Sequence, residues 1–409
     1  MLVGMRLIAA PTTDDVEADA FAFKKDIIEI KSNSWGPSDN AYGTSGPGPL
    51  SKAALIDAAT TGRGGKGTIF VWAGGNGNAN GDDSNYDGWA ASPYAIAVGA
   101  IGDDGESVWY GEPGANILVC APSNGGTQSI TTTDRAGAVG YSSGDYTSTF
   151  GGTSSATPAV AGVVALMLQA NPNLTYRDVQ EILMRTASKN DPNNGGWVTN
   201  GAGFDFHHQY GSGLVNADAA TSLAAIWTNL DPRQTRTNIA TDLPLSIPDG
   251  SNAGLTKTFT VGNTDNLRLE HVTVSVKATH PYRGQLEWWL VSPSGVRSRL
   301  ARSRGNDTGA NLDWTFMSTH FWGERSEGDW KLQVYDTDLA DAGTLDEATI
   351  TFYGTPATGG LPAPIITSNL IIVGREGASM DYQITASNFP TSFGAINLPP
   401  GISINTSTG

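Results

Sequence analysis

The sequence has a single cysteine, Cys120, among its 409 residues, so no disulfide can form within the chain. Long apolar runs are also missing, because the longest candidate, residues 159–168, is shorter than a membrane span. Basic residues are few, with 24 Lys and Arg against 40 Asp and Glu, and no basic block occurs. These absences argue against a disulfide scaffold, a membrane span and attraction to nucleic acid or anionic lipid.

The composition instead provides a formal charge of −16, 39% hydrophobic residues and 51 glycines, which is typical of a globular, loop-rich protein. The acidic balance suits cationic ligands such as calcium or basic peptides. A solvated acidic surface that only aids solubility would have the same composition.

The first half of the chain alternates short apolar runs with helical patterns. The runs at 2–9, 27–31, 68–73 and 95–101 are rich in Val and Ile, as buried strands are. The opening MLVGMRLIAAP carries Arg6 and no basic n-region, so it indicates a strand and not a signal peptide. Strands that alternate with helices predict a parallel sheet flanked by helices.

The second half has a different period. Residues 227–240 form a predicted linker, and 241–356 alternate apolar and polar positions in short aromatic runs, as in a β-sandwich. A Pro/Gly-rich linker at 357–362 precedes a further β pattern at 363–409, which stops after NTSTG. We therefore expect an α/β domain at 1–226, a β domain and part of a third domain.

One motif indicates chemistry. In GGTSSATPAVAG, residues 151–162, two serines stand at the predicted start of a helix, where free N–H groups and the helix dipole favour negative charge. Pro158 is tolerated if it lies in the first turn. A hydroxyl there becomes a nucleophile only with a base and with donors for the oxyanion that it generates. The simpler alternative is that Ser154 or Ser155 is the helix N-cap.

The segment GTSSATP and the following AVAGVVALMLQANPNLTYRDVQEIL resemble the nucleophile region of the subtilisin-like serine peptidases, in the kexin and furin branch. The segments SNSWGPSDN, VWAGGNGN, DDSNYDGW and HHQYGSGLVNADAA are similar to kexin-family segments, in the same order. Downstream, LEHVTVSV, HPYRGQLEWWLVSPSGV and GDWKLQVYD resemble the P domain of these peptidases, and the tail is similar to the start of a bacterial Ig-like repeat.

This resemblance implies three structural units. The first is an α/β subtilisin-like parallel-sheet domain at 1–226, incomplete at its N-terminus. A β-sandwich jelly-roll P domain at 241–356 and a partial Ig-like β domain at 363–409 follow it.

The resemblance also implies roles for individual residues. Ser154, which follows Gly-Thr, corresponds to the nucleophile. Asn76 in AGGNGN corresponds to the donor that stabilises the oxyanion, although an asparagine between glycines can also be a left-handed turn residue. The implied contacts to the extended substrate backbone come from Ser34, Trp35, Gly36 and Gly75. Trp35 could equally be a core aromatic.

Acidic residues complete the implied site. Asp39 and Asp87 correspond to the acids at the base of the pocket for the basic residue before the cleaved bond, and two carboxylates suit a guanidinium fork. Asp39, Asp82 and Glu112 fall where related enzymes bind calcium, which prefers oxygen ligands. The alternative is that these are unrelated surface acids.

The family's general base has no counterpart in this sequence. The Asp and His motifs of the D-S/T-G and H-G-T types, which precede the serine in the family, do not occur. The five histidines all follow the nucleophile motif: His207, His208, His271, His280 and His320. We therefore expect a chain truncated at its N-terminus and in its C-terminal domain, and inactive alone.

The function implied is that of a hydrolase: a calcium-dependent, kexin-like serine protease of the subtilase type that carries out proteolysis after basic residues of peptide or protein substrates. Asp14 and Glu17 would line pockets for more distant basic residues. The resemblance further implies a secreted or cell-surface protein. The lone cysteine favours a prokaryotic origin, and we expect a monomer. The alternative is a non-catalytic surface or adhesion protein on a pseudo-peptidase scaffold.

Overall fold

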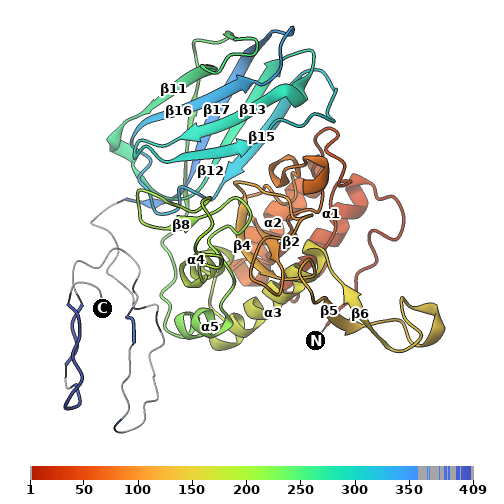
Figure 1. The fold of residues 1–409 in the computed structure, drawn as a ribbon, viewed down its shortest axis with the longest axis vertical. Coiled ribbons are helices and arrows are strands. Elements are labelled where there is room, and N and C mark those ends of the chain that lie inside the picture. The colour runs from red at the N-terminus through yellow and green to blue at the C-terminus, as the bar shows by residue number, and fades with distance from the viewer. Residues whose placement is uncertain are drawn as a thin grey trace.

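A computed structural model of the chain describes residues 2–357 and, after them, only isolated residues and short pieces between 366 and 406. Figure 1 shows an α/β unit followed by a β unit. The partial Ig-like domain expected at 363–409 falls mostly outside the described residues and remains a prediction.

Four parallel strands form the centre of the first unit. They are, in spatial order, β1 (Ile30–Asn33), β2 (Ile69–Ala73), β3 (Ala95–Ile101) and β4 (Ile117–Pro122). Every residue of β2 and β3 is buried, as expected for strands that have helices on both faces. The parallel sheet predicted from the alternating pattern is present.

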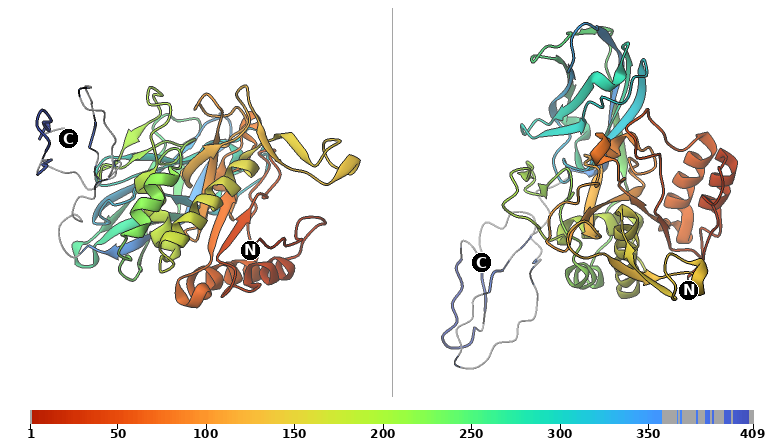
Figure 2. Two further views of the ribbon diagram at one scale, coloured as in Figure 1. Left: turned by 90° about the horizontal axis from the view of Figure 1, so that it is seen from below. Right: turned by 45° about the vertical axis from the view of Figure 1, so that its right-hand side comes forward.

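Helices cover both faces of this sheet (Figure 2). One face carries α1 (Asp14–Ala22) and α2 (Pro49–Gly65), and the other carries α3 (Thr153–Ala170), α4 (Tyr176–Thr186) and α5 (Ala217–Ala225). Phe70 and Trp72 pack with α1 and α2, whereas Ile69 and Val71 pack with the helices opposite. The two-residue period of β2 therefore supplies both layers of the core.

By length and composition alone, α3 could cross a membrane. Among the helices of the described residues, it is the one that passes this test. In this fold it is a core helix, because Val160, Val164 and Met167 are fully buried within the cluster that covers the sheet.

The second unit consists of two antiparallel sheets. One sheet contains β9 (Gln234–Ile239), β10 (Leu245–Ile247), β12 (Leu267–Thr279), β15 (Leu312–Ser318) and β17 (Gly343–Pro356). The other contains β11 (Leu255–Val261), β13 (Leu286–Val291), β14 (Arg297–Ala301) and β16 (Gly328–Asp336). Trp288 and Trp330 from one sheet pack with Phe316 and Phe352 from the other. The predicted β-sandwich is therefore present.

Shorter elements lie in the loops. The hairpin of β5 (Ile130–Thr133) and β6 (Tyr146–Phe150) leads into α3, and β7 (Val198–Thr199) pairs with β8 (Asp205–Phe206). Short 3-10 turns occur at Asn78–Asn80, Ser84–Tyr86, Gly137–Val139, Asn263–Asp265 and Arg283–Gln285.

A buried polar interface joins the two units. Arg177 of α4 donates to both carboxylate oxygens of Glu270 on β12, and both side chains are almost fully buried. Glu181, also on α4, accepts from Arg268 at 3.1 Å and from the indole N–H of Trp322 at 2.5 Å. The sandwich is thus fixed to α4 by charged groups that are withdrawn from water.

Three features differ from the sequence prediction. Residues 2–9 are not a strand, since Leu2 and Ile8 are exposed and no described strand pairs with the segment. A buried parallel strand needs strand neighbours and covering helices, and the described residues provide neither to this segment. The strand β4 has no counterpart in the prediction. The strand β9 lies inside the expected linker 227–240 and pairs with β17, so the sandwich begins before residue 241.

Candidate active site

The first turn of α3 carries the two serines. Gly152, with φ of 77°, is the N-cap residue, so neither serine has the capping role considered as an alternative. Ser155 is buried, and its hydroxyl shares a 2.8 Å hydrogen bond with the hydroxyl of Ser123. Ser154 lines a cavity, and its Oγ lies 3.5 Å from the carbonyl oxygen of Ser34. Ser154 is therefore the serine of the motif that faces open space.

Pro158 lies in the second turn of α3, and not in the first turn as expected. Because proline has no backbone N–H, the carbonyl of Ser154, four residues earlier, loses its usual helical donor. The hydroxyl of Ser34 donates to this carbonyl at 2.9 Å. The loop after β1 is thereby bonded to the first turn of α3.

Asn76 follows β2 and contacts the residue before Ser154. Its amide oxygen accepts from the backbone N–H of Thr153 at 2.8 Å and from the Thr153 hydroxyl at 3.0 Å. Its backbone N–H donates to Asp39 at 3.0 Å, and its amide nitrogen lies 3.5 Å from the same carboxylate. The amide oxygen is thus occupied, and the amide nitrogen is the group available to an oxyanion at Ser154.

The approach of β2 to the cavity requires glycine at position 75. Gly75 has φ of 102°, and a Cβ atom there would lie 2.4 Å from the carboxyl group of Glu112. Its N–H donates to the hydroxyl of Thr153 at 3.2 Å. The backbone therefore passes between Glu112 and the start of α3 with no room for a side chain.

The site residues expected from the sequence line one cavity of about 360 Å³. They are Ser34, Trp35, Gly36, Asp39, Gly75, Asn76, Asp82, Asp87, Glu112 and Ser154. They come from the loops after β1 and β2, from the loop before β4 and from α3. Ligand sites in open parallel sheets are typically found at the carboxyl ends of strands, where these loops meet.

The ring of Trp35 belongs to the hydrophobic core. It packs against Trp72, Trp89 and Phe21, with centroid distances of 4.8, 5.4 and 6.5 Å. Its carbonyl accepts from the indole N–H of Trp72 at 2.7 Å. The ring of Trp35 is therefore a core aromatic, as the alternative held, and the residue also lines the cavity.

Asp87 is a buried carboxylate of the cavity wall. Burial, and then the charges of Asp82 and Asp39, raise its pKa to about 7 against the backbone N–H bonds that favour its charged form. The carboxyl group approaches Gly36 so closely that a Cβ there would lie 2.7 Å from one oxygen. This environment favours a cationic partner, which would offset the cost of keeping the carboxylate charged.

Asp39, Asp82 and Glu112 offer the oxygen donors that suit a hard cation such as calcium. Burial, and then the charges of Asp82, Asp39 and Asp87, raise the pKa of Glu112 well above its usual range. One oxygen of Asp82 accepts from Ala41 N–H at 2.8 Å. Across the described part of the chain, no three His, Cys, Asp or Glu side chains are arranged as a metal site. The charge distribution fits a cation, but the carboxylates do not form a closed shell.

Two acids expected at distant substrate pockets have partners within the fold. Asp14 accepts from the backbone N–H groups of Leu50 and Ser51 at 2.9 and 2.8 Å, at the start of α2. Glu17 accepts from Thr12 at 2.8 Å and from the indole of Trp89 at 3.3 Å. Neither acid lines the cavity.

Sequence reasoning missed Arg304, a residue of the sandwich that lines this cavity. Its segment SRGND carries no local pattern that indicates a contact with the other unit. None of the five histidines lines the cavity. Their ring partners are Asn194 for His207, Arg299 for His208, Trp322 for His271, Asp336 for His280 and Ser298 for His320.

Comparison with known proteins identifies the fold family. Residues 7–213 match the subtilase family, and residues 269–352 match the proprotein convertase P-domain. The chain belongs to the subtilase family. A subtilase unit followed by a P domain is a kexin- and furin-like architecture, as the sequence motifs indicated.

The curated relatives of this subtilase include furin of Homo sapiens, which is 36% identical over 405 residues, covering 95% of this chain and 50% of furin. Proprotein convertase subtilisin/kexin type 7 of Homo sapiens is 39% identical over 366 residues, covering 86% of this chain and 46% of that protein. The chain thus spans about half the length of these relatives. A serine protease of Aeromonas sobria has the same fold, with a TM-score of 0.75 at 23% identity over 85% of this chain and 75% of that one.

Proposed function

We propose that this subtilase is a serine endopeptidase that cleaves peptide bonds after basic residues. The observation that carries the proposal is the single cavity in which Ser154, Asn76 and the carboxylates of Asp39 and Asp87 meet. Membership of the subtilase family supports the reaction class.

In the proposed reaction, the Oγ of Ser154 attacks the carbonyl carbon of the substrate, and the carbonyl oxygen becomes an oxyanion. The amide nitrogen of Asn76 and the N-terminal end of α3 stabilise this charge, and one such donor contributes about 3 to 4 kcal/mol to the transition state. The serine proton passes to a general base, which is a histidine oriented by an aspartate in the serine peptidase template. No histidine of residues 1–409 lines the cavity, so this proposal assigns no general base within these residues.

The specificity follows from the acids. A guanidinium presents a planar fork of donors, which two carboxylates can accept, whereas an uncharged side chain would leave Asp87 buried without a cation. An arginine before the cleaved bond is therefore the substrate side chain that we propose for this pocket.

Peptide hydrolysis by the full-length gene product tests this proposal. We expect hydrolysis after arginine and its loss in the Ser154→Ala variant. In Asp87→Asn, kcat/KM should fall by about tenfold or more for an arginine peptide but change little for a norleucine peptide, because only the first needs the carboxylate.

The matched control is Asp218→Asn, which removes an exposed carboxylate at the start of α5, outside the cavity. This variant should retain wild-type kcat/KM. Absence of hydrolysis by the full-length protein would contradict the peptidase, and an equal loss for both peptides in Asp87→Asn would contradict the pocket.

We also propose that the cavity binds calcium through Asp39, Asp82 and Glu112. The support is electrostatic, since a bound cation would offset both the burial and the repulsion from neighbouring acids that raise the pKa of Glu112. When bound, the ion would supply a fixed positive charge under the substrate pocket.

Chelation tests the calcium proposal. Saturating calcium at about 100 times its Kd would stabilise the native state by about 2.7 kcal/mol, so EDTA should lower Tm by roughly 3 to 6 °C. In Glu112→Gln, this EDTA-induced shift should be smaller. A wild-type Tm that chelation leaves unchanged would contradict the site.

A further inference from the structure

A loop of the P domain reaches into the cavity of the subtilase unit. It connects β14 to β15, and its Arg304 lines the cavity. Among the described residues that line the cavity, Arg304 is the only basic one, and its side chain is 2% exposed. The remaining charged residues of the lining are acids.

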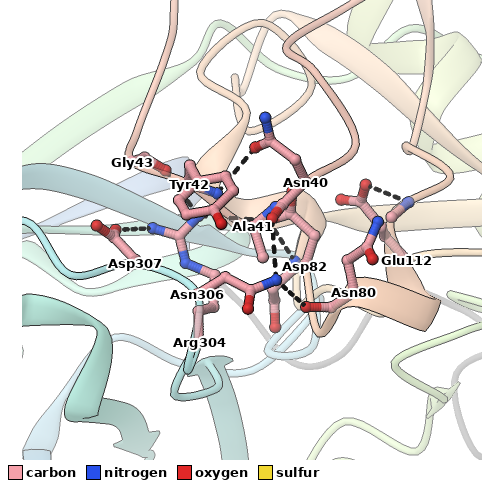
Figure 3. Close-up of polar contacts among 12 residues, drawn as sticks. Asn40, Ala41, Tyr42, Gly43, Asn80, Asp82, Glu112, Arg304, Asn306 and Asp307 are labelled. Atoms are coloured by element: carbon pink, nitrogen blue, oxygen red, sulfur yellow. Dashed lines mark hydrogen bonds and ion pairs between the residues drawn. The ribbon is translucent and has the colours of Figure 1, made fainter.

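The guanidinium of Arg304 bonds to both domains. One nitrogen donates to the carbonyl oxygen of Gly43 at 2.6 Å and lies 3.3 Å from Asp82, and the other donates to Asp307 at 2.7 Å. Figure 3 shows the group between these partners. The Cζ atom of the guanidinium also lies 3.5 Å from the ring centroid of Tyr86, which is a cation–π contact. One side chain thus holds two segments of the subtilase unit.

Those two segments carry the walls of the proposed substrate pocket. Tyr86 directly precedes Asp87, and Gly43 follows Asp39 by four residues in the loop after β1. The segments are joined to each other, since Ser45 N–H lies 3.4 Å from the carbonyl oxygen of Tyr86 and Ser45 bridges with Asp87. Arg304 therefore fixes the backbone directly before Asp87 and the loop that carries Asp39.

A second side chain of the same P-domain loop supports this arrangement. The amide nitrogen of Asn306 lies 3.3 Å from the carbonyl oxygens of both Asn40 and Asn80 (Figure 3). Asn80 in turn donates to the carbonyl oxygen of Asp39 at 2.7 Å. The loop is thus bonded to the chain directly beside Asp39.

Arg304 also forms ion pairs with some of the nearby acids but not with others. Asp82 and Asp307 are paired with the guanidinium, and a buried pair of this kind cannot lose one partner without leaving an uncompensated charge. Asp39 and Asp87 have no contact with Arg304 and remain for a ligand. The P domain therefore supplies a counter-charge for Asp82 and leaves Asp39 and Asp87 for recognition of a basic side chain.

We propose that Arg304 is a positioning residue for the basic-residue pocket: it fixes the Gly43 and Tyr86 segments so that Asp39 and Asp87 are held at the separation that a planar guanidinium needs. The inference rests on the proposed function. It means that the substrate preference of the subtilase unit is set in part by a side chain of the P domain.

Ligand binding to the chain of residues 1–409 tests this proposal without requiring turnover. The probes are p-aminobenzamidine, a planar amidine, and cadaverine, a flexible amine, with dissociation constants measured by fluorescence and by competition. In Arg304→Gln, we expect amidine binding to weaken by about tenfold or more and amine binding by less than about threefold, because only the fork requires a fixed pair of acceptors. Arg304→Lys restores the charge but not the fork, so it should not restore the amidine preference.

The matched control is Arg297→Gln. Arg297 is an exposed residue of β14 whose guanidinium stacks on Trp289 at 3.7 Å, away from the cavity. This variant should keep both affinities. Amidine and amine affinities that fall equally in Arg304→Gln, or that do not change, would overturn the proposal.

Hydrogen exchange tests the positioning role of Arg304 independently of whether the cavity binds a basic ligand. Without any ligand, Arg304→Gln should accelerate amide exchange at Ala41, Ser45 and Gly88, while Arg297→Gln should not. If the wild-type chain binds neither probe, the proposed pocket fails, and exchange then decides the positioning role by itself. Unchanged exchange in Arg304→Gln would overturn it.

Discussion

At Gly75 the main chain lies so close to Glu112 that a methyl group would overlap its carboxyl carbon. We predict that Gly75→Ala lowers the free energy of unfolding by about 2 to 4 kcal/mol. About 1 kcal/mol comes from the positive φ and the rest from overpacking. Urea unfolding followed by circular dichroism measures the change.

Gly81 provides the control for this prediction. It has φ of 83°, similar to Gly75, but no atom lies within 4 Å of the place where its Cβ would stand. Gly81→Ala should therefore cost only about 1 kcal/mol, the backbone contribution. If both variants lost the same free energy of unfolding, contact with Glu112 would not be the reason that position 75 needs glycine.

At the scale of elements, sequence patterns indicated the helices and strands that are stabilised by residues close in the chain. Thr175 and Asp178 have the spacing of a capping box, and both of its hydrogen bonds are present at the start of α4. The apolar runs at 68–73 and 95–101 correspond to β2 and β3. The run at 2–9 is also mostly apolar but forms no strand, because a strand depends on its neighbours as well.

At the scale of the whole molecule, a buried histidine should make stability depend on pH. His271 of β12 packs edge-on against Trp322. Burial, and then the charges of Arg233 and Arg177, lower its pKa to about 3 despite the opposing charge of Glu181. The unfolded chain therefore binds this proton between about pH 6.5 and pH 3 while the folded protein does not, so stability is lost as pH falls through that range.

We predict that the wild type loses about 2 kcal/mol more than His271→Phe between pH 7 and pH 5. The contributions of other groups, such as Asp83 with its pKa raised to about 6 mainly by burial, are common to both proteins and cancel in the difference. Urea unfolding of both proteins at each pH provides the measurement. Parallel losses would show that His271 is charged in the folded protein.

The sequence by itself determined the features that depend on neighbouring residues in the chain: a helix that starts just before Ser154, the αL glycines, and the residue types at positions 76 and 87. Their meeting in one cavity, the inward packing of the Trp35 ring and the arrival of Arg304 from the P domain were decided only by the tertiary structure. The reason is physical. Backbone preferences and apolar periodicity act over a few residues, whereas the contact of Arg304 with Asp82 depends on how two folded domains dock, and no short-range pattern records that geometry.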